Sequence, residues 1–497
     1  MVEKRNFWGG PEKKPSKVTA EKHNYTIWYV LAGFALIAVI AAIILNNNFK
    51  KSQIVDVENS IIVDNGDLKI NWNRYNTVNV ELKETYTIAR SGIYHFTGEL
   101  SGGNIIVNVT SGEVKIILDN VTISSSDGPA IACLAADDLV IELIGENTLS
   151  DGEAYSKNYD EDVAGAIYSK ADLTFEGEGT LNLAANYQDA IVSKDDLKFN
   201  SGKYNIVAKD DGIRGKDSVY IVNGDFEIES KSDGIKSINE TDAGKGFVLI
   251  EDGTIAIASG DDGIHAINSL IIKGGAIDIK KSYEGLEAQN IIINGGDITI
   301  IANDDGINAG GGSNNSATNN GKVGMFDSDS NCILTVNNGN IYVNAAGDGI
   351  DSNGYIYFNG GTVVVDGPTN NGNGALDSGI SIIQNGGSVI AIGAGGMAET
   401  PGLESSVNNI SIMFNSTQKA GTKIAIKNSS GETIIEHISA KTFSHMSAGT
   451  TELKTGETYT IYVDDEAYQT FTISGTVTTV GNTHNGQNMM PPGGMRR

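Results

Sequence analysis

The sequence predicts an all-β protein built as a right-handed parallel β-helix with about 22 residues per coil. A short motif recurs along it: an acidic residue, then glycine or alanine, then an aliphatic residue, at intervals of 22, 22, 29, 22, 21 and 43 residues. The acidic residues of this motif are Asp189, Asp211, Asp233, Asp262, Glu284, Asp305 and Asp348. Strand-like segments separated by glycine turns fill the intervals. A fixed period of this length with such filler is typical of a stacked solenoid.

Each interval divides into three short strands. In residues 189–210 the segments AIVS, DLKFN and KYNIVA alternate apolar and polar residues, and a glycine turn at Gly202 separates the last two. Neither a leucine framework nor a helix occurs in each unit, which argues against a leucine-rich repeat. The interval of 43 residues fits two coils, or one coil with an insertion. The Gly- and Asn-rich segment 309–330 is the expected excursion loop.

Composition divides the chain into six segments. The β-helix is expected over residues 60–400, and strands of a different texture over 401–480 predict a small C-terminal antiparallel β module. That module either caps the last coil, whose apolar layer needs a cover, or packs beside it as a sandwich. A basic segment (1–24), a transmembrane helix (25–45) and a linker (46–59) precede the β-helix, and a disordered tail (481–497) follows the module.

The segment from Tyr25 to Leu45 is an uncharged apolar run long enough to cross a bilayer as a helix. Six lysine and arginine residues precede it, so the positive-inside rule leaves the N-terminus in the cytoplasm. A cleaved signal peptide is the alternative, but no convincing small-residue cleavage site follows the run. We therefore expect a single-pass protein of the cell membrane whose remaining residues are extracellular.

The chain is strongly acidic, with a net charge of −27. Residues 1–51 carry 8 of its 35 Lys and Arg residues but only 3 of its 62 acidic residues, so the imbalance lies beyond the apolar segment. Such a surface repels nucleic acid and attracts cations, although it also fits an ordinary soluble extracellular protein. Cys133 and Cys332 lie far apart beside aliphatic residues, and we expect buried free thiols.

The repeated acidic residues predict a cation site. Equivalent residues of adjacent coils lie about 4.8 Å apart, and carboxylates that close repel one another unless they are neutralised. Calcium binds oxygen ligands, so an ion fits between two stacked carboxylates. The alternative for each residue is a turn whose carboxylate accepts hydrogen bonds from local backbone N–H groups. The stacked candidates for Ca²⁺ positions are Asp210 or Asp211, Asp233, Asp261 or Asp262, Glu284, Asp304 or Asp305, and Asp348. A second acidic cluster near the end of the stack comprises Asp348, Asp351, Asn353, Asp366 and Asp377.

Basic residues are scarce and regularly placed. Lys170, Lys194 and Lys216 each follow the motif's aliphatic residue by three positions, and Arg214 is near the last of them. They predict a short cationic ladder beside the acidic one, which would bind sugar carboxylates with the help of calcium. The alternative is a set of neutralising ion pairs between coils, with Asp172, Asp195 and Asp217 as partners.

No residue is assigned a catalytic role. A glycosidase needs two carboxylates with separated pKa values, and the ladder distinguishes no such pair. A lyase needs a strong base beside metal-bound substrate. Arg214 is the only arginine between Arg90 and Arg496. His265, in GDDGIHA, is expected at the coil surface.

Several motifs resemble those of the bacterial carbohydrate-binding calcium β-helix proteins: SGEVKIILDNVTI, NTLSDG, AIYSKADLTFEGEGTLNL, DDGIRGKDSV, GDGIDSNG and GPTNNGNGALDSG. The resemblance covers roughly residues 60–475. It implies a pectate-lyase-like β-helix that holds calcium and binds cellulose or acidic sugars such as polygalacturonate, without catalysis. It also implies six Ca²⁺ ligands: Asp211, Asp233, Asp262, Asp305, Asp348 and Asp351. The motif departs from Asp-Gly at Asp189 and Glu284, and the membrane span differs from the family pattern.

Three hypotheses about function follow. The first is a membrane-anchored, calcium-dependent polysaccharide-binding protein, with acidic sugars or cellulose as the partner. The second is a lyase or hydrolase acting on pectin-like uronans, and the third is a structural or adhesive surface protein that calcium stiffens. Aromatic residues form only 7% of the chain, which argues against a flat aromatic platform for crystalline cellulose.

Overall fold

A computed structural model describes residues 61, 70–156, 163–310 and 328–481. These residues are almost entirely β-strand, with one short 3₁₀ helix, η2 (Trp72–Arg74). Within these ranges no helix is long and apolar enough to cross a bilayer. The expected transmembrane helix (25–45), its flanking segments and the tail beyond residue 481 lie outside the described residues.

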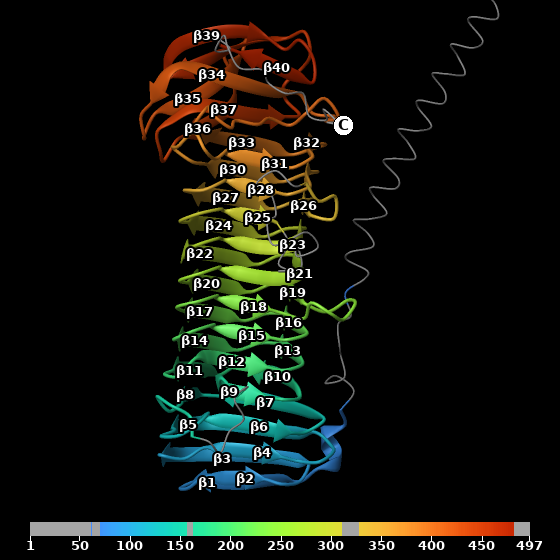
Figure 1. Cartoon of the computed structure of the whole chain (residues 1–497), viewed down its shortest axis with the longest axis vertical. Helices are drawn as coiled ribbons and strands as arrows, with labels where there is room; N and C mark the ends of the chain where they lie inside the picture. Colours follow the sequence, from blue (N-terminus) through green and yellow to red (C-terminus); the bar gives the residue numbers. More distant parts are fainter. Residues whose placement is uncertain (1–60, 62–69, 157–162, 311–327, 482–497) are drawn as a thin grey trace, which may run out of the picture. The chain divides into compact units, whose positions relative to one another are not determined.

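The strands wind in coils of three. Strands β12 (Asp189–Ser193), β13 (Asp196–Phe199) and β14 (Lys203–Ala208) pair in parallel with β15 (Ile213–Gly215), β16 (Ser218–Ile221) and β17 (Asp225–Glu229) of the next coil. The three strands are those that the alternating pattern of residues 189–210 predicts. Repetition of this pairing stacks the coils as in a parallel β-helix (Figure 1). The handedness of the winding stays a prediction.

The three strand positions form three columns. The first column contains β2 (Tyr86–Ile88), β4 (Ile105–Asn108), β6 (Ile131–Ala135), β9 (Gly165–Ser169), β12, β15, β18 (Ile235–Ser237), the start of β21 (Ile264–Ile272) and of β23 (Leu286–Ile293), β25 (Ile307–Ala309), β28 (Ile350–Ser352) and β31 (Leu376–Ser378). The second contains β1 (Thr77–Leu82), the starts of β3 (Gly92–Ser101) and β5 (Val114–Ser124), β7 (Asp138–Ile144), β10 (Asp172–Gly177), β13, β16, β19 (Phe247–Ile250), the ends of β21 and β23, β26 (Ile333–Val336), β29 (Tyr355–Phe358) and β32 (Ser381–Gln384). The third contains the ends of β3 and β5, then β8 (Glu146–Ser150), β11 (Thr180–Ala185), β14, β17, β20 (Thr254–Ala258), β22 (Ala276–Ser282), β24 (Asp297–Ala302), β27 (Asn340–Ala345), β30 (Thr362–Asp366) and β33 (Ser388–Gly393).

Two irregular intervals of the repeat are insertions into single coils. Between Asp305 and Asp348 the chain makes one coil, because β23 pairs directly with β26, β24 with β27 and β25 with β28. The extra residues lie between β25 and β26, where the sequence predicts an excursion loop. The interval of 29 residues likewise contains one coil, with a loop between β18 and β19.

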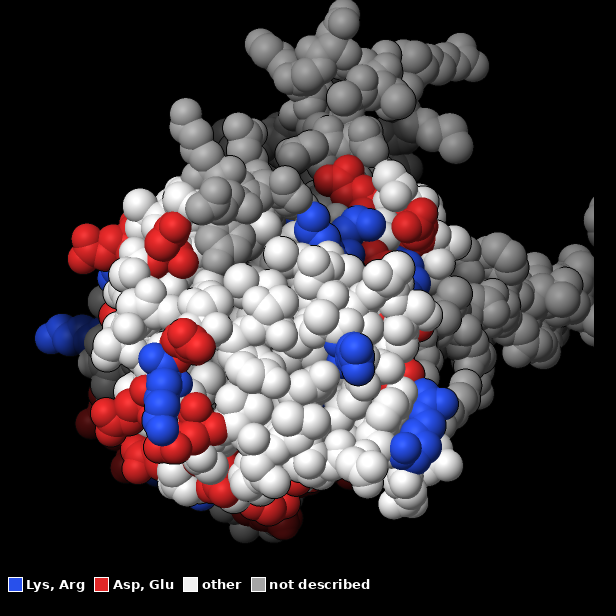
Figure 2. Space-filling model, turned by 90° about the horizontal axis from the view of Figure 1, so that it is seen from below, with Lys and Arg blue, Asp and Glu red and all other residues white. Residues whose placement is uncertain are grey.

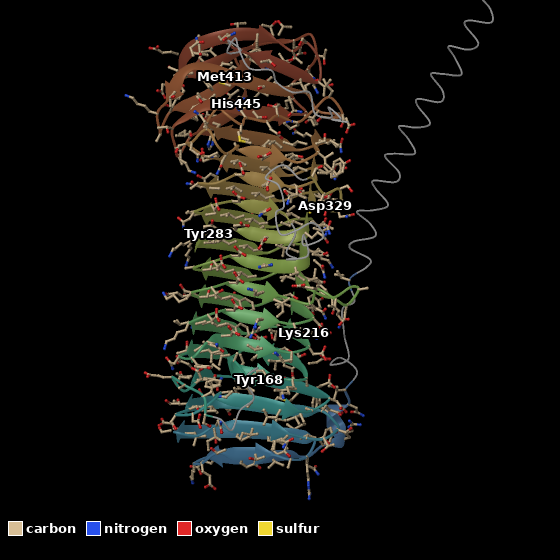
Figure 3. The ribbon with its side chains drawn as sticks, viewed as in Figure 1. Tyr168, Lys216, Tyr283, Asp329, Met413 and His445 are labelled. Carbon is tan, nitrogen blue, oxygen red and sulfur yellow. The ribbon has the colours of Figure 1, made fainter. Side chains whose placement is uncertain are left out.

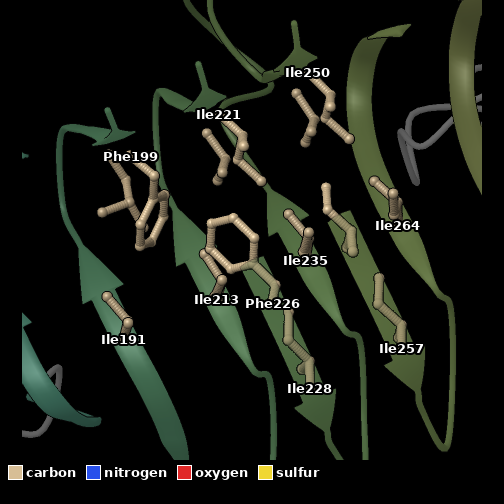
Figure 4. Packing of buried hydrophobic residues seen from close by; sticks show 14 of the residues in the cluster. Ile191, Phe199, Ile213, Ile221, Phe226, Ile228, Ile235, Ile250, Ile257 and Ile264 are labelled. Carbon is tan, nitrogen blue, oxygen red and sulfur yellow. The ribbon is translucent and has the colours of Figure 1, made fainter. Parts of the chain in front are cut away.

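The interior consists of stacked apolar columns. Ile191, Ile213, Ile235 and Ile264 occupy equivalent places in successive coils, and all four are buried (Figure 4). An aromatic cluster lies among them: the rings of Phe175 and Phe199 are 5.1 Å apart and nearly parallel. Because each layer covers its neighbour, no coil buries its apolar side chains alone, which explains why the repeat continues over so many residues.

Glycine is required at the turn between the second and third strands. Gly253 has φ 120°, and a Cβ atom there would lie 2.7 Å from the carbonyl oxygen of Gly224 in the preceding coil. The same contact recurs at Gly275, Gly296, Gly339, Gly361 and Gly387. Both the left-handed backbone and the close stacking exclude a side chain, as the sequence pattern of glycine turns predicts.

The C-terminal module closes the last coil by continuing its sheet. Strand β37 (Phe443–Thr450) pairs antiparallel with β33 and with β34 (Asn409–Gln418), which pairs in parallel with β40 (Val477–Val480). Four antiparallel strands form a second sheet: β35 (Lys423–Asn428), β36 (Thr433–Ile438), β38 (Thr458–Val463) and β39 (Glu466–Thr472). The module has its own apolar core, which also includes Ile390 and Ile392 of β33. Figure 3 labels Met413 and His445 within this module.

Polar contacts strengthen this junction. The carboxylate of Asp366 in β30 lies 3.0 Å from Nε2 of His437 and accepts a hydrogen bond from Ser439, both residues of the module. Tyr342 also donates to it. Despite burial, these contacts hold the pKa of Asp366 below its usual range. Asp366 therefore anchors the module and does not join Asp348, Asp351 and Asp377, with which the sequence groups it.

Charged side chains concentrate around the perimeter of the coils. Seen from the N-terminal end of the described stack, acidic groups gather at the rim and few charges lie near the centre (Figure 2). Both cysteines are buried free thiols, as predicted, and burial raises the pKa of Cys133 to about 11. The surface chemistry therefore lies along the sides of the stack.

Candidate functional site

The seven repeated acidic residues lie one above another at the turn that enters the first column of strands. We call this set, defined above, the acidic ladder. Its register is fixed by backbone hydrogen bonds between adjacent turns, such as Gly212 N–H to Asp233 C=O and Gly306 N–H to Asp348 C=O, each 2.9 Å. Figure 3 labels Tyr283, the residue before Glu284, on the side of the stack opposite Lys216.

One oxygen of most ladder carboxylates is used by the backbone of the next coil. Oδ1 of Asp189 accepts a hydrogen bond from Asp211 N–H, and Oδ1 of Asp211 accepts one from Asp233 N–H, both 3.1 Å. The contact recurs from Asp262 to Asp233, from Asp348 to Asp305 and from Gly374 to Asp348. These hydrogen bonds resemble the turn alternative, except that each carboxylate accepts from a backbone N–H of the next coil and not from its own turn. The second oxygen is left for another partner.

A second column of side chains lies beside the ladder, three residues after each ladder residue from Asp211 onward; the equivalent position after Asp189 is Val192. We call it the flanking column: Arg214, Lys236, His265, Glu287, Asn308, Asp351 and, in the last coil, Asp377. It begins with three basic residues and continues with acidic or amide ones. The flanking column therefore divides the ladder into two parts with opposite electrostatics.

In the lower part, side chains of the protein neutralise the ladder. Arg214 Nη2 lies 2.5 Å from Oδ2 of Asp189, and Lys236 forms an ion pair with Asp233. His265 Nδ1 lies 3.3 Å from Oδ2 of Asp262. Burial alone would lower the pKa of His265, but the surrounding carboxylates raise it above its ordinary value. A half-buried His265 corrects the expectation of a coil-surface residue.

In the upper part, no described lysine, arginine or histidine forms an ion pair with Glu284, Asp305, Asp348, Asp351 or Asp377. Burial, with repulsion from Asp377 next in size, raises the pKa of Asp351 to about 8. Burial also raises the pKa of Asp305 to about 7 and that of Asp348 to about 6, and neighbouring carboxylates add to both shifts. These side chains are half-buried and reachable from solvent, whereas Asp189, Asp211 and Asp233 are buried.

The metal-free chain is expected to lose stability as the pH rises from about 4 to about 8. Unfolded carboxyl groups ionise near pH 4. The folded upper ladder keeps its protons to higher pH, with pKa values of about 6, 7 and 8 at Asp348, Asp305 and Asp351. The native state therefore binds more protons across this window, and the free energy of unfolding falls with pH. Unfolding midpoints in EDTA at pH 5 and pH 8 measure the effect. A higher midpoint at pH 8 would contradict it.

The upper part fits an oxygen-liganded cation. Oδ1 of Asn308 is buried and has no hydrogen-bond donor among the described residues, while its Nδ2 donates to Glu284 over 3.0 Å. Of its column neighbours, Glu287 lies 3.3 Å from Nδ1 of His265, and Asp351 offers a carboxylate that accepts hydrogen bonds and donates none when ionised. A cation ligated by Asn308 and this carboxylate would satisfy an otherwise costly buried acceptor.

Groups of carboxylates in the described residues also approach closely enough to share an ion. Oxygens of Asp262, Glu284 and Glu287 lie within 4.8 Å of one another, at the boundary between the two parts of the ladder. Asp233, Asp262 and His265 form a similar group, but Lys236 already pairs with Asp233. Of the six expected calcium ligands, Asp305, Asp348 and Asp351 therefore lie where no cationic side chain of the described residues competes. Asp211, Asp233 and Asp262 lie beside basic side chains.

The three lysines stack as the spacing predicts, but away from the ladder. Ser169 pairs with Ser193 and Ser193 with Gly215, so Lys170, Lys194 and Lys216 follow one another at the far end of the same short strands. Lys216 follows Asp211 by five positions, which is at most about 17 Å of extended chain. Lys216 Nζ is 3.7 Å from Asp217 of the same coil, whereas the alternative expects ion pairs between coils. Arg214 belongs to the flanking column and is not part of this strip.

One basic residue at this edge was not predicted. Lys245, in the loop between β18 and β19, lies 3.0 Å from Asp196 and 3.4 Å from Asp217. Lys245 neutralises these two carboxylates, and Asn239 donates a further hydrogen bond to Asp217. The interval of 29 residues was the available signal that a loop departs here, but the period does not show where such a loop folds back.

The model of a family described as carbohydrate-binding domain-containing proteins matches residues 82–332, which span most of the stack and the ladder from Asp189 to Asp305. The chain belongs to this family. A family relative of the same description from Acetivibrio thermocellus is 33% identical over 158 residues, 31% of this chain and 54% of that protein. The chain thus matches about half the length of this relative.

A solved structure is also similar to part of the chain. It is described as the structure of the polysaccharide lyase-like protein from C. thermocellum, in a gadolinium derivative. The two are 28% identical, and the similarity covers 44% of this chain and 92% of that one, with a TM-score of 0.39.

Proposed function

We propose that this chain is a membrane-anchored, extracellular protein that binds polysaccharide with the help of calcium and does not cleave it. Membership of the carbohydrate-binding domain family supports the partner class. The observation that supports the calcium part is the buried Oδ1 of Asn308, which has no hydrogen-bond donor among the described residues and lies beside Asp351, a carboxylate with no basic partner among them. The apolar segment 25–45 supports the anchor and the extracellular location.

The calcium ligands in this proposal are those of the upper ladder. Asn308, Asp351 and Asp377 are register neighbours in the flanking column, and Asp305 and Asp348 occupy adjacent turns of the ladder. Calcium takes six to eight oxygen ligands, so these residues and solvent share its coordination. Because the upper ladder is half-exposed, a sugar carboxylate can replace solvent on the outer side of the ion. This favours acidic glycans as ligands of the ladder.

The absence of catalysis in this proposal follows from the same geometry. In the upper ladder burial and neighbouring carboxylates raise the pKa of Asp305, Asp348 and Asp351 in the same direction, and no basic partner among the described residues sets one of them apart as an acid or a base. Arg214 is bound to Asp189 and is not available as a base. The ladder is suited to holding an ion and a ligand at rest.

Retention on a polygalacturonate resin tests the proposal. The full-length protein in detergent is expected to be retained in calcium and released by EDTA, because the resin carboxylates complete the coordination of the ladder ions. Absence of retention on both polygalacturonate and cellulose would rule out the binding function. Ultraviolet absorbance from unsaturated sugar products, growing with time in calcium, would instead establish a lyase.

A further inference from the structure

A groove crosses the outer face of the third column of strands, on a surface separate from the acidic ladder. It has a volume of about 520 Å³ and is lined by residues of β8, β11, β14, β17, β20 and β22. These six strands pair in parallel, so the groove runs along the stack, across five strand spacings or about 24 Å. This shape suits an extended polymer chain.

Small side chains form the floor of the groove. Ala184, Ala256 and Ala258 point outward, whereas the residues between them, such as Ile257, point into the core. Val207 is 53% exposed and extends the apolar surface. The register of β20 and β22 shifts after Ile257, and Lys280 lies at this irregularity and forms one end of the groove. The result is a shallow, partly apolar hollow between longer side chains.

Polar groups of the groove are balanced in charge. Glu227 pairs with Lys280 over 3.6 Å, and Glu229 pairs with Lys231 over 3.9 Å. Asn205 donates to Asn182 over 2.8 Å, which leaves further amide hydrogens and oxygens for a ligand. On a chain with a net charge of −27, this is a surface of paired charges, amides and methyl groups.

We infer that this groove binds a neutral polysaccharide chain, as a second glycan site independent of calcium. The inference rests on the proposed function in that it assumes a polysaccharide ligand. Alanine and valine methyl groups contact the C–H faces of sugar rings, while Asn182, Asn205 and Glu227 exchange hydrogen bonds with hydroxyl groups. An apolar floor with a few placed polar groups is the usual composition of a ligand site.

Charge selects the class of glycan at this groove. A polyuronate would place its carboxylates near Glu227 and Glu229, whose lysine partners are exposed and already engaged. A neutral chain meets no such repulsion. A peptide strand would need a free sheet edge for backbone pairing, but the groove lies on a sheet face whose strands are paired on both sides.

Binding of cellohexaose to the full-length protein in EDTA tests the inference. The wild-type chain is expected to bind, and Ala256→Trp is expected to weaken binding at least tenfold, because the indole fills the floor of the groove. Val207→Trp gives a second, more exposed block should the first variant fold poorly. The matched control is Thr299→Trp, on β24. Ala256 pairs in register with Asp278 of the next strand, and Asp278 pairs with Thr299. Thr299 therefore occupies the same column but does not line the groove.

The outcomes separate this inference from the proposed function. Loss of cellohexaose binding in Ala256→Trp, with wild-type binding in Thr299→Trp and calcium-dependent retention on polygalacturonate intact, supports two sites. Failure of wild-type protein to bind cellohexaose in EDTA, or unchanged binding in both groove variants, overturns the second site and leaves the ladder proposal standing. If the wild-type protein binds cellohexaose in EDTA but is not retained on polygalacturonate in calcium, the ladder proposal is overturned and the groove site stands.

Discussion

Replacement of Asp351 by asparagine is expected to lower the affinity of the chain for calcium about 100-fold, or about 2.8 kcal/mol. Asp351 lies in the flanking column between Asn308 and Asp377 and has no basic partner among the described residues. Its carboxylate supplies negative charge that an amide cannot replace, and calcium affinity depends strongly on the charge of the ligand set. Titration with calcium by isothermal calorimetry at pH 8 measures the change. At lower pH protons compete more strongly with calcium, since burial raises the pKa of Asp351 to about 8.

Asp211→Asn provides the matched control. Asp211 occupies the same ladder but lies beside Arg214, and the amide keeps the oxygen that accepts the N–H of Asp233. Calcium affinity is expected to stay within about twofold of the wild-type value in this variant. Equal losses in both variants would show that calcium depends on the ladder as a whole. Loss in Asp211→Asn alone would place the ion in the lower part and contradict the proposal.

The sequence predicts the coils because their cause is local. A repeated pattern of short strands, acidic turns and glycine turns needs no knowledge of distant residues, and β12, β13 and β14 lie where residues 189–210 place them. The stacking of Lys170, Lys194 and Lys216 follows from spacing alone. Spacing does not state at which end of a strand a residue lies, so the lysines were expected beside the ladder and lie at the opposite edge.

The division of the ladder follows from residues that the motif leaves unspecified. Arg214, Lys236, His265 and Asp351 share one position after the motif, but their effect depends on which carboxylate of an adjacent coil each one meets. Only the register shows that Arg214 meets Asp189 of the preceding coil. The grouping of Asp366 with the upper acidic residues is wrong for a similar reason, because its partners His437 and Ser439 come from the C-terminal module.

Replacement of Arg214 by methionine is expected to destabilise the lower coils by about 3 kcal/mol at pH 8. Asp189 is 2% exposed, and removing one member of a buried ion pair leaves an uncompensated charge. Burial raises the pKa of Asp189 to about 7 even with Arg214 present. Below pH 6 its proton therefore replaces the guanidinium, and the loss shrinks. Hydrogen exchange of the amides of β12 and β15 reports this local stability.

The double variant Asp189→Asn, Arg214→Met separates the charge from the contact. Asparagine keeps an oxygen for the N–H of Asp211, so removing both charges is expected to restore most of the lost stability. If the double variant is as unstable as Arg214→Met, packing of the arginine stem accounts for the loss instead.

The variant Arg214→Asp tests whether the flanking residue decides how the ladder is neutralised. It gives the lower coil an acidic flanking residue like those of the upper part, so calcium in solution is expected to stabilise this variant more than the wild-type chain. If calcium does not slow hydrogen exchange of the β12 and β15 amides in Arg214→Asp, the flanking column does not decide how the ladder is neutralised.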